Sequence, residues 1–266
     1  MQRKTQLFDI RAATVFMALV SGSLVVPSHA SSDRASAADV HTRTSDGPKA
    51  SVSDATVTGA MADAGARLEA ASVFDGSGWR DASLGGIDRD VFSLALESAE
   101  RAVARGDAQP STLTVIDFSR PSTQRRLWVY DLRSRELLFE EHVSHGRNSG
   151  HDVPTAFSNE EGSYKSSLGL FRTAEGYIGK HGYSLRLDGL EKGFNDRARE
   201  RAIVIHGAEY VNATVARAQG RLGRSLGCPA VRPAIAKDLI DAVKEGGLLF
   251  AYYPDPVWLS GSAYLN

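Results

Sequence analysis

The sequence contains a single cysteine, Cys228, among its 266 residues. No disulfide can form within the chain, and the same count excludes zinc sites built from several cysteines and iron–sulfur clusters. The fold must therefore rest on a hydrophobic core, for which this length and a 42% share of hydrophobic residues are sufficient. The formal net charge of −1 offers no basic surface to a nucleic acid, so we expect no such partner.

The first 30 residues have the pattern of a secretory signal peptide. Three basic residues occur among the first eleven, 12–26 carries no charge, and Ser28-His29-Ala30 places small residues where a signal peptidase cleaves. A retained membrane anchor is the alternative, but this stretch is shorter than the roughly 20 apolar residues that span a bilayer. We predict cleavage after Ala30, export, and no stable membrane anchor after cleavage.

Export places Cys228 in an oxidising compartment, where it is an intermolecular partner, a buried passenger or a reactive thiol. Its neighbours Gly227 and Pro229 favour the reactive thiol, because a buried passenger more often lies among Val, Ile and Leu. Gly227 permits a close approach of the backbone to a substrate. The N–H groups of Gly227 and Cys228 can also point together at one oxyanion.

Composition divides the rest of the chain. Residues 31–72 are rich in small and polar residues and contain no aromatic residue, which predicts a flexible linker. Residues 73–110 are predicted as a helical lead-in that ends at Gly106-Asp107. We assign residues 111–256 to a catalytic domain and residues 257–266 to a C-terminal tail.

Strand patterns dominate the predicted catalytic domain. The predicted strands are 113–117, 127–132, 137–144, 183–187, 202–205 and 248–253. One helix with a single apolar face precedes the last strand, beginning at Pro233 and closed by Gly246-Gly247. We therefore predict a mainly β fold with flanking helices.

A reactive thiol needs a base within hydrogen-bond reach. His206 is the best candidate, because it follows an apolar strand pattern and precedes Gly207, whose carbonyl can fix the imidazole tautomer. The alternative for His206 is a hydrogen-bonded core histidine. His181 and His145 are rival bases that spacing does not separate from it.

A metal site formed by His142, His145 and His151 is a further alternative. No pattern of acidic ligands accompanies these histidines, and their spacing suits a scatter over strand and loop. We expect no metal site.

The Ile-His-Gly strand end and the later run Gly-Arg-Ser-Leu-Gly-Cys-Pro-Ala-Val resemble the active-site signature of the YkuD-type L,D-transpeptidases. Within that family the sequence resembles the branch of murein L,D-transpeptidase catalytic domain proteins. The likeness covers roughly 113–253 and includes segments 116–119, 143–150, 157–159, 166–169 and 195–196. It implies the YkuD-like catalytic domain as the fold.

The resemblance implies that Cys228 is the nucleophile, that His206 is its base, and that the Gly207 carbonyl orients the base. It also implies an oxyanion hole made by the N–H groups of Gly227 and Cys228. Ser225 matches a Ser/Thr position of the family. For Ser225, a substrate or oxyanion contact and a local turn-stabilising bond are both open.

The sequence differs from the family pattern at two positions. The better-known members carry Ser-His-Gly-Cys-x-Arg, and here Leu226 occupies the His position and Ala230 the Arg position. Another residue must then replace the missing arginine, and Arg224 and Arg232 are the candidates. For Arg224, binding of a substrate carboxylate and a surface salt bridge are alternatives. His145 either lines the substrate cleft or is a structural imidazole.

The reaction that the resemblance implies is ping-pong acyl transfer between peptidoglycan stem peptides, through a thioester on Cys228 and without a cofactor. It also implies a place in the bacterial periplasm or cell envelope, and inhibition by carbapenems. The sequence leaves open which L–D bond of the donor is attacked. The alternatives are an L,D-carboxypeptidase or endopeptidase that uses water as acceptor, and a non-catalytic cell-wall-binding protein.

Overall fold

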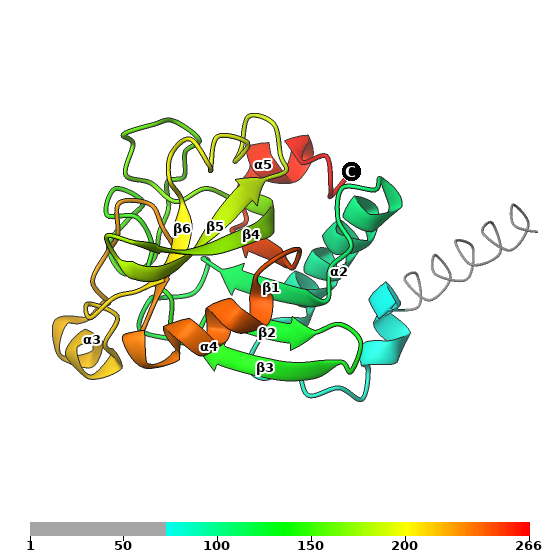
Figure 1. The fold of residues 1–266 in the computed structure, drawn as a ribbon, viewed down its shortest axis with the longest axis horizontal. Coiled ribbons are helices and arrows are strands. Elements are labelled where there is room, and N and C mark those ends of the chain that lie inside the picture. Colours follow the sequence, from blue (N-terminus) through cyan, green and yellow to red (C-terminus); the bar gives the residue numbers. More distant parts are fainter. Residues whose placement is uncertain (1–72) are drawn as a thin grey trace, which may run out of the picture. The chain divides into compact units, whose positions relative to one another are not determined.

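The computed structural model describes residues 73–266. The predicted signal peptide, 1–30, and the predicted linker, 31–72, lie outside the described residues. The described part forms one mixed eight-stranded sheet with helices packed against it, which confirms the predicted mainly β fold with flanking helices (Figure 1). Within this part, no helix is long and apolar enough to cross a membrane.

The strands are β1 (Thr112–Asp117), β2 (Leu127–Asp131), β3 (Glu136–Glu141), β4 (Gly169–Gly179), β5 (Gly182–Gly189), β6 (Val204–Gly207), β7 (Ala230–Val231) and β8 (Leu248–Tyr252). The helical elements are the 3₁₀ turn η1 (Gly76–Trp79), α2 (Arg89–Ala104), α3 (Ala213–Gln219), α4 (Pro233–Val243) and α5 (Pro256–Gly261). Across the sheet the order is β3-β2-β1-β8-β4-β5-β6-β7. The β1–β8 and β6–β7 pairs are parallel, and the other neighbours are antiparallel.

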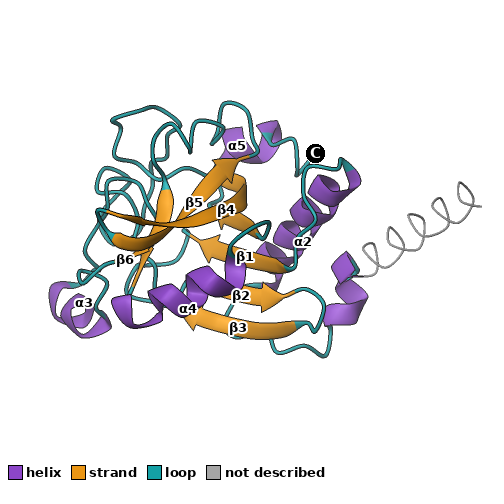
Figure 2. Cartoon of the chain, viewed as in Figure 1, coloured by secondary structure: helices purple, strands orange, loops and turns teal. Residues whose placement is uncertain are grey.

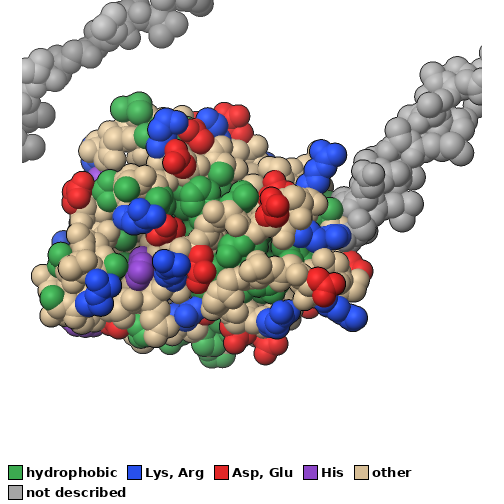
Figure 3. Space-filling view, turned by 90° about the horizontal axis from the view of Figure 1, so that it is seen from below, with side chains coloured by type: hydrophobic (Ala, Val, Ile, Leu, Met, Phe, Trp, Pro, Cys, Tyr) green, Lys and Arg blue, Asp and Glu red, His purple; other side chains and the backbone are tan. Residues whose placement is uncertain are grey.

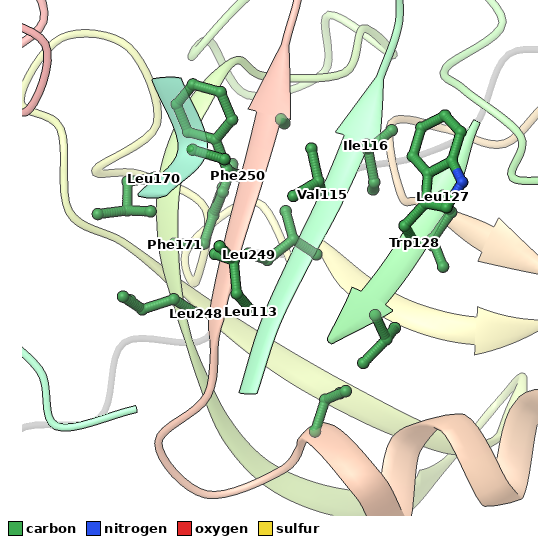
Figure 4. Close-up of a cluster of buried hydrophobic side chains, with 14 of the residues drawn as sticks. Leu113, Val115, Ile116, Leu127, Trp128, Leu170, Phe171, Leu248, Leu249 and Phe250 are labelled. Atoms are coloured by element: carbon green, nitrogen blue, oxygen red, sulfur yellow. The ribbon is translucent and has the colours of Figure 1, made fainter. Parts of the chain in front are cut away.

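The hydrophobic core lies where β1, β2, β4 and β8 meet (Figure 4). Helix α2 packs against β1 and β8, and α4 packs against β1, β4, β5 and β6. The labelled core residues are Leu113, Val115, Ile116, Leu127, Trp128, Leu170, Phe171, Leu248, Leu249 and Phe250. Burial of each such side chain contributes about 1.5–3 kcal/mol to folding, so this core can hold the sheet together without a disulfide.

Both predicted helices form, and their ends follow from capping. The Asp88 carboxylate accepts two N–H groups of the first turn of α2. At the other end, the N–H of Asp107 bonds to the Ala102 carbonyl, and Gly106 takes the left-handed conformation that this Schellman arrangement needs. Helix α4 begins at Pro233 as predicted, because a proline at the first helical position loses no hydrogen bond.

The sheet differs from the sequence prediction near the candidate site. The sequence predicts no strand at β4, where Gly176 interrupts the run, and none at β7, which has only two residues. The strand predicted at 202–205 lies two residues later, as β6. Ala202 has a φ of 52°, in the left-handed region, which a non-glycine residue does not adopt in a regular strand. His206 therefore lies inside the strand rather than after its end.

Three further elements differ from the prediction. Strand β3 ends before 142–144, because the N–H of Ser144 bonds to the Ala230 carbonyl of β7 instead. The sequence predicts neither α3, which Asn212 caps, nor α5. Helix α5 begins at Pro256, the last residue of the predicted catalytic domain, and runs into the predicted tail 257–266; its Trp258 is buried in the main core. The tail therefore packs against the sheet domain.

Candidate active site

Strand β6 and the loop before β7 bring the two predicted catalytic residues to one edge of the sheet. In the parallel β6–β7 pair, His206 lies opposite Ala230, two residues after Cys228. The thiol of Cys228 donates a hydrogen bond to the carbonyl of Ala202, just before β6, at 3.5 Å. Loops gather around this end of the sheet (Figure 2). Cys228 thus contacts the residue just before β6, the strand that carries His206.

The imidazole of His206 is buried and oriented by its neighbour. Its Nδ1 lies 3.0 Å from the Gly207 carbonyl oxygen. Because a carbonyl only accepts, Nδ1 carries the hydrogen and Nε2 holds the lone pair of the neutral ring. Burial lowers the pKa of His206, and the charges of His181 and Lys180 lower it further. His206 is therefore a neutral imidazole near pH 7 with the tautomer of a general base, as predicted from the Gly207 carbonyl.

The thiol of Cys228 is protonated in this conformation. Burial raises its pKa, although the backbone N–H of Val204 and the charges of Lys180 and Arg201 act in the opposite direction. Among residues 73–266, the hydrogen-bond partner of Sγ is Ala202, and Sγ makes no hydrogen bond to His206. Proton transfer to Nε2 therefore requires the thiol hydrogen to leave the Ala202 carbonyl.

The two rival histidines have different environments. His181 lies in the exposed turn between β4 and β5, and its ring stacks on His206 with centroids 4.3 Å apart. His145 is fully buried, with Nδ1 2.8 Å from the Arg126 guanidinium and Nε2 3.4 Å from the Gly150 carbonyl. Burial and the charge of Arg126 lower the pKa of His145 to about 3. His145 therefore matches the structural alternative rather than a residue that lines the substrate cleft.

Ser225 ties the cysteine loop to itself. Its Oγ accepts the N–H of Gly227 at 3.0 Å and donates to the carbonyl of Cys228 at 2.6 Å. This is the local turn bond that was one of its two predicted roles. It also differs from the predicted oxyanion hole, because the Gly227 N–H is occupied by Ser225 in this conformation.

Two segments that carried the family resemblance, 143–150 and 166–169, form hydrogen bonds to the loop that contains Cys228. Ser166 Oγ donates to the Gly227 carbonyl and accepts the N–H of Gly146, both at 3.0 Å. The Ser225 N–H bonds to the His145 carbonyl at 2.9 Å. Gly227 has a φ of 129°, and a Cβ there would meet the Lys165 carbonyl oxygen at 2.9 Å. Only glycine therefore fits at position 227, directly before Cys228.

The two arginines proposed as substitutes for the missing one are engaged elsewhere. Arg224 donates to the carbonyls of Arg147 and Gly150 at 3.0 and 2.7 Å. These partners are backbone oxygens rather than the carboxylate of a surface salt bridge, and binding of a substrate carboxylate stays a prediction. Arg232 forms an ion pair with Glu141 at 2.6 Å.

Arg201 is a residue that sequence reasoning missed. Its guanidinium donates to the Ser158 carbonyl, the Ser167 hydroxyl and the Lys165 carbonyl, and its charge lowers the pKa of Cys228. It lies in a charged, turn-rich stretch without periodicity, so nothing in the pattern distinguishes it. Arg201 thus joins the loop around Ser158 to the segment 165–167, which packs against Gly227.

The three histidines of the alternative metal site are separately engaged. His142 bonds to the Thr123 carbonyl, His151 bonds to Arg221, and His145 is held as described above. Across the described part of the chain, no group of His, Cys, Asp and Glu is arranged to hold a metal ion.

An open pocket of about 310 Å³ lies beside Gly207, between the β4–β5 turn and α4. Its lining includes His181, Tyr183, Glu209 and Lys237. Because His181 stacks on His206, the pocket opens next to the candidate base. On the face shown in Figure 3, acidic and basic side chains are interspersed, without a patch of one sign.

Residues 84–252 match the family described as the L,D-transpeptidase catalytic domain. This match covers more than half of the chain, which therefore belongs to that family, as the sequence resemblance predicted. A comparison with curated proteins gives no match.

Solved structures of L,D-transpeptidases show weak overall similarity. One from Mycobacterium smegmatis is 15% identical with a TM-score of 0.34, over 54% of this chain and 59% of that chain. L,D-transpeptidase 1 of Mycobacterium tuberculosis is 15% identical with a TM-score of 0.31, over 54% and 62%. LdtMt1 in complex with imipenem is 16% identical with a TM-score of 0.33, over 53% and 59%. This chain thus spans less than two thirds of each.

Proposed function

We propose that this protein is a cysteine-dependent L,D-transpeptidase that uses peptidoglycan stem peptides as donor and acceptor. The observation that carries the proposal is the β6–β7 pairing, which places His206 beside the loop of Cys228. Since Nδ1 of His206 is bonded to Gly207, Nε2 is the atom that accepts a proton from the thiol. Membership of the L,D-transpeptidase catalytic domain family supports the same reaction class.

In the first half-reaction, Sγ of Cys228 bonds to the carbonyl carbon of an L-residue in the donor stem, and its proton passes to Nε2 of His206. The N–H of Cys228 is the donor for the oxyanion, because the Gly227 N–H is bonded to Ser225. His206 then protonates the amine of the following D-residue as the C–N bond breaks. The donor remains as a thioester on Cys228.

In the second half-reaction, an amine of a neighbouring stem attacks the thioester carbonyl. His206 takes the amine proton and returns it to Sγ as the C–S bond breaks, so that a cross-link forms. Water as the acceptor gives the L,D-carboxypeptidase or endopeptidase outcome with the same two residues. No step needs a metal or an organic cofactor.

The test incubates the purified protein with defined muropeptides and follows the products by mass spectrometry. We expect dimers with the wild type and none with Cys228→Ala, whose folding is checked by thermal unfolding. Trimmed monomers without dimers would assign the hydrolase. Binding without any product would assign a wall-binding protein, and dimers formed by Cys228→Ala would rule out the nucleophile.

We also propose export to the periplasm or cell envelope, supported by the signal-like residues 1–30, and acylation by carbapenems. Attack of Sγ on a β-lactam carbonyl opens the ring and adds the whole inhibitor to the protein. Intact-protein mass spectrometry should show one added carbapenem on the wild type and none on Cys228→Ala. Equal labelling of both proteins would contradict this assignment.

A further inference from the structure

The turn between β4 and β5 reaches the candidate base. Gly179 pairs with Gly182 at the end of the hairpin, so Lys180 and His181 form its tip. The His181 ring stacks on His206 at 4.3 Å, with the two planes 21° apart. Lys180 therefore directly precedes the residue that contacts the candidate base.

Lys180 differs from the arginines near the site in having neither a hydrogen-bond acceptor nor an ion-pair partner among the described residues. Its side chain is exposed, and within residues 73–266 no carboxylate forms an ion pair with it. Arg224 and Arg201 are bonded to backbone carbonyls, and Arg232 is paired with Glu141. Lys180 is thus a cation beside the base that is available to a ligand.

The charge of Lys180 acts on both catalytic groups. It lowers the pKa of the Cys228 thiol, and it also lowers the pKa of His206. A cation that influences both groups lies near the place where the scissile bond must be held between them. Exposure of Lys180 to solvent leaves its ammonium free to meet a charged group of the substrate.

We propose that Lys180 binds the α-carboxylate of the D-residue that leaves the donor stem. This inference rests on the proposed function. His206 protonates the leaving amine, and the α-carboxylate of that residue is only two bonds from the amine nitrogen. The hairpin tip that contacts His206 therefore presents its ammonium next to this carboxylate. The Lys ammonium is a compact point charge without the bidentate fork of arginine, which fits a carboxylate that must leave after each turnover. Lys180 would thus select donors whose leaving residue has a free carboxylate.

The test measures kcat/KM for two donors that differ only at the leaving residue, one ending in a free carboxylate and one in a carboxamide. We expect the wild type to prefer the carboxylate by about 10-fold, which is the size of one charge-assisted hydrogen bond. Lys180→Met should lose this preference, mainly through KM, and Lys180→Arg should retain most of it. The preference, rather than the rate, is the readout, because a changed pKa of Cys228 or His206 affects both donors equally.

Lys192→Met serves as the matched control, since Lys192 is an exposed lysine in the loop after β5. We expect it to keep the wild-type preference. An unchanged preference in Lys180→Met would overturn the inference while leaving the proposed function intact. A wild type that converts neither donor, alone or with an acceptor stem, would overturn both.

Discussion

The thiol of Cys228 donates its hydrogen bond to the carbonyl of Ala202, at 3.5 Å, and Ala202 is a non-glycine residue in the left-handed conformation. The left-handed turn directs this carbonyl at Sγ of Cys228, immediately before β6 begins. The bond occupies the thiol hydrogen, and burial raises the pKa of Cys228. The site at rest therefore holds a neutral thiol and a neutral imidazole, and attack must be coupled to proton transfer.

The first prediction concerns the pH dependence of the two catalytic groups. The pKa of His206 is lowered from 6.5 and that of Cys228 is raised from 9.0, in both cases chiefly by burial. Protonation of His206 removes the base, so the acidic limb of kcat/KM should have its midpoint below pH 6.5. Alkylation of Cys228 by iodoacetamide needs the thiolate and should have its midpoint above pH 9. An alkylation midpoint below pH 8 would instead indicate a resting thiolate–imidazolium pair.

The second prediction concerns backbone strain at Ala202. An L-residue with a side chain at φ of 52° is strained by about 1–2 kcal/mol, and glycine is not. We expect Ala202→Gly to raise the free energy of unfolding by about 1 kcal/mol, measured by urea denaturation. Ala99→Gly, in the middle of α2, should lower it by about 1 kcal/mol or more. A destabilised Ala202→Gly would show that the left-handed conformation stores no strain.

The third prediction concerns the hydroxyl that ties the cysteine loop together. Ser225→Ala leaves the Gly227 N–H and the Cys228 carbonyl without their partner. An unsatisfied buried group costs about 1–3 kcal/mol, so the midpoint of urea unfolding should fall accordingly. A displaced nucleophile should also lower kcat by up to about 100-fold. Ser225→Thr keeps the hydroxyl and should stay near wild type. If Ser225→Thr lost as much stability as Ser225→Ala, the loss could not be assigned to the two hydrogen bonds.

The fourth prediction concerns acid stability. His145 has a pKa of about 3 in the folded protein, against 6.5 for an ordinary histidine. Between these values the unfolded chain binds a proton that the folded chain does not, so stability falls as the pH falls through this window. The contribution is about 1.4 kcal/mol per pH unit. His145→Gln should reduce the slope of unfolding free energy against pH between 6 and 4 by about that amount, and an identical slope would contradict the buried neutral imidazole.

The elements predicted well from the sequence are those whose signals are local. Helices α2 and α4 carry apolar stripes, and Gly106 and Pro233 mark the end of the one and the start of the other. The strands of the core consist of apolar runs because they are buried on both faces. By contrast, β7 exists only because its two residues pair with His206 and Gly207. No pattern within two residues predicts such a pairing.

The same distinction holds for the site. The contact between His206 and the Gly207 carbonyl was predicted, because it follows from neighbours in sequence, whereas the catalytic roles of Cys228 and His206 stay predictions. The bond of Ser225 to Gly227, the left-handed Ala202 and the bridging Arg201 depend on contacts between separate loops. A sequence pattern contains no information on which of several hydrogen-bond donors remains unoccupied after folding.

The central claim is that acyl transfer passes through Cys228, and a trapped acyl-enzyme tests it most directly. The protein is mixed with a donor stem in the absence of an acceptor, quenched in acid within the first turnovers, and mapped by peptide mass spectrometry. We predict a mass increase equal to the donor minus its leaving D-residue, located on the peptide that contains Cys228 and released by hydroxylamine. An acyl group on another residue, or product formation of undiminished rate in Cys228→Ala, would contradict the account.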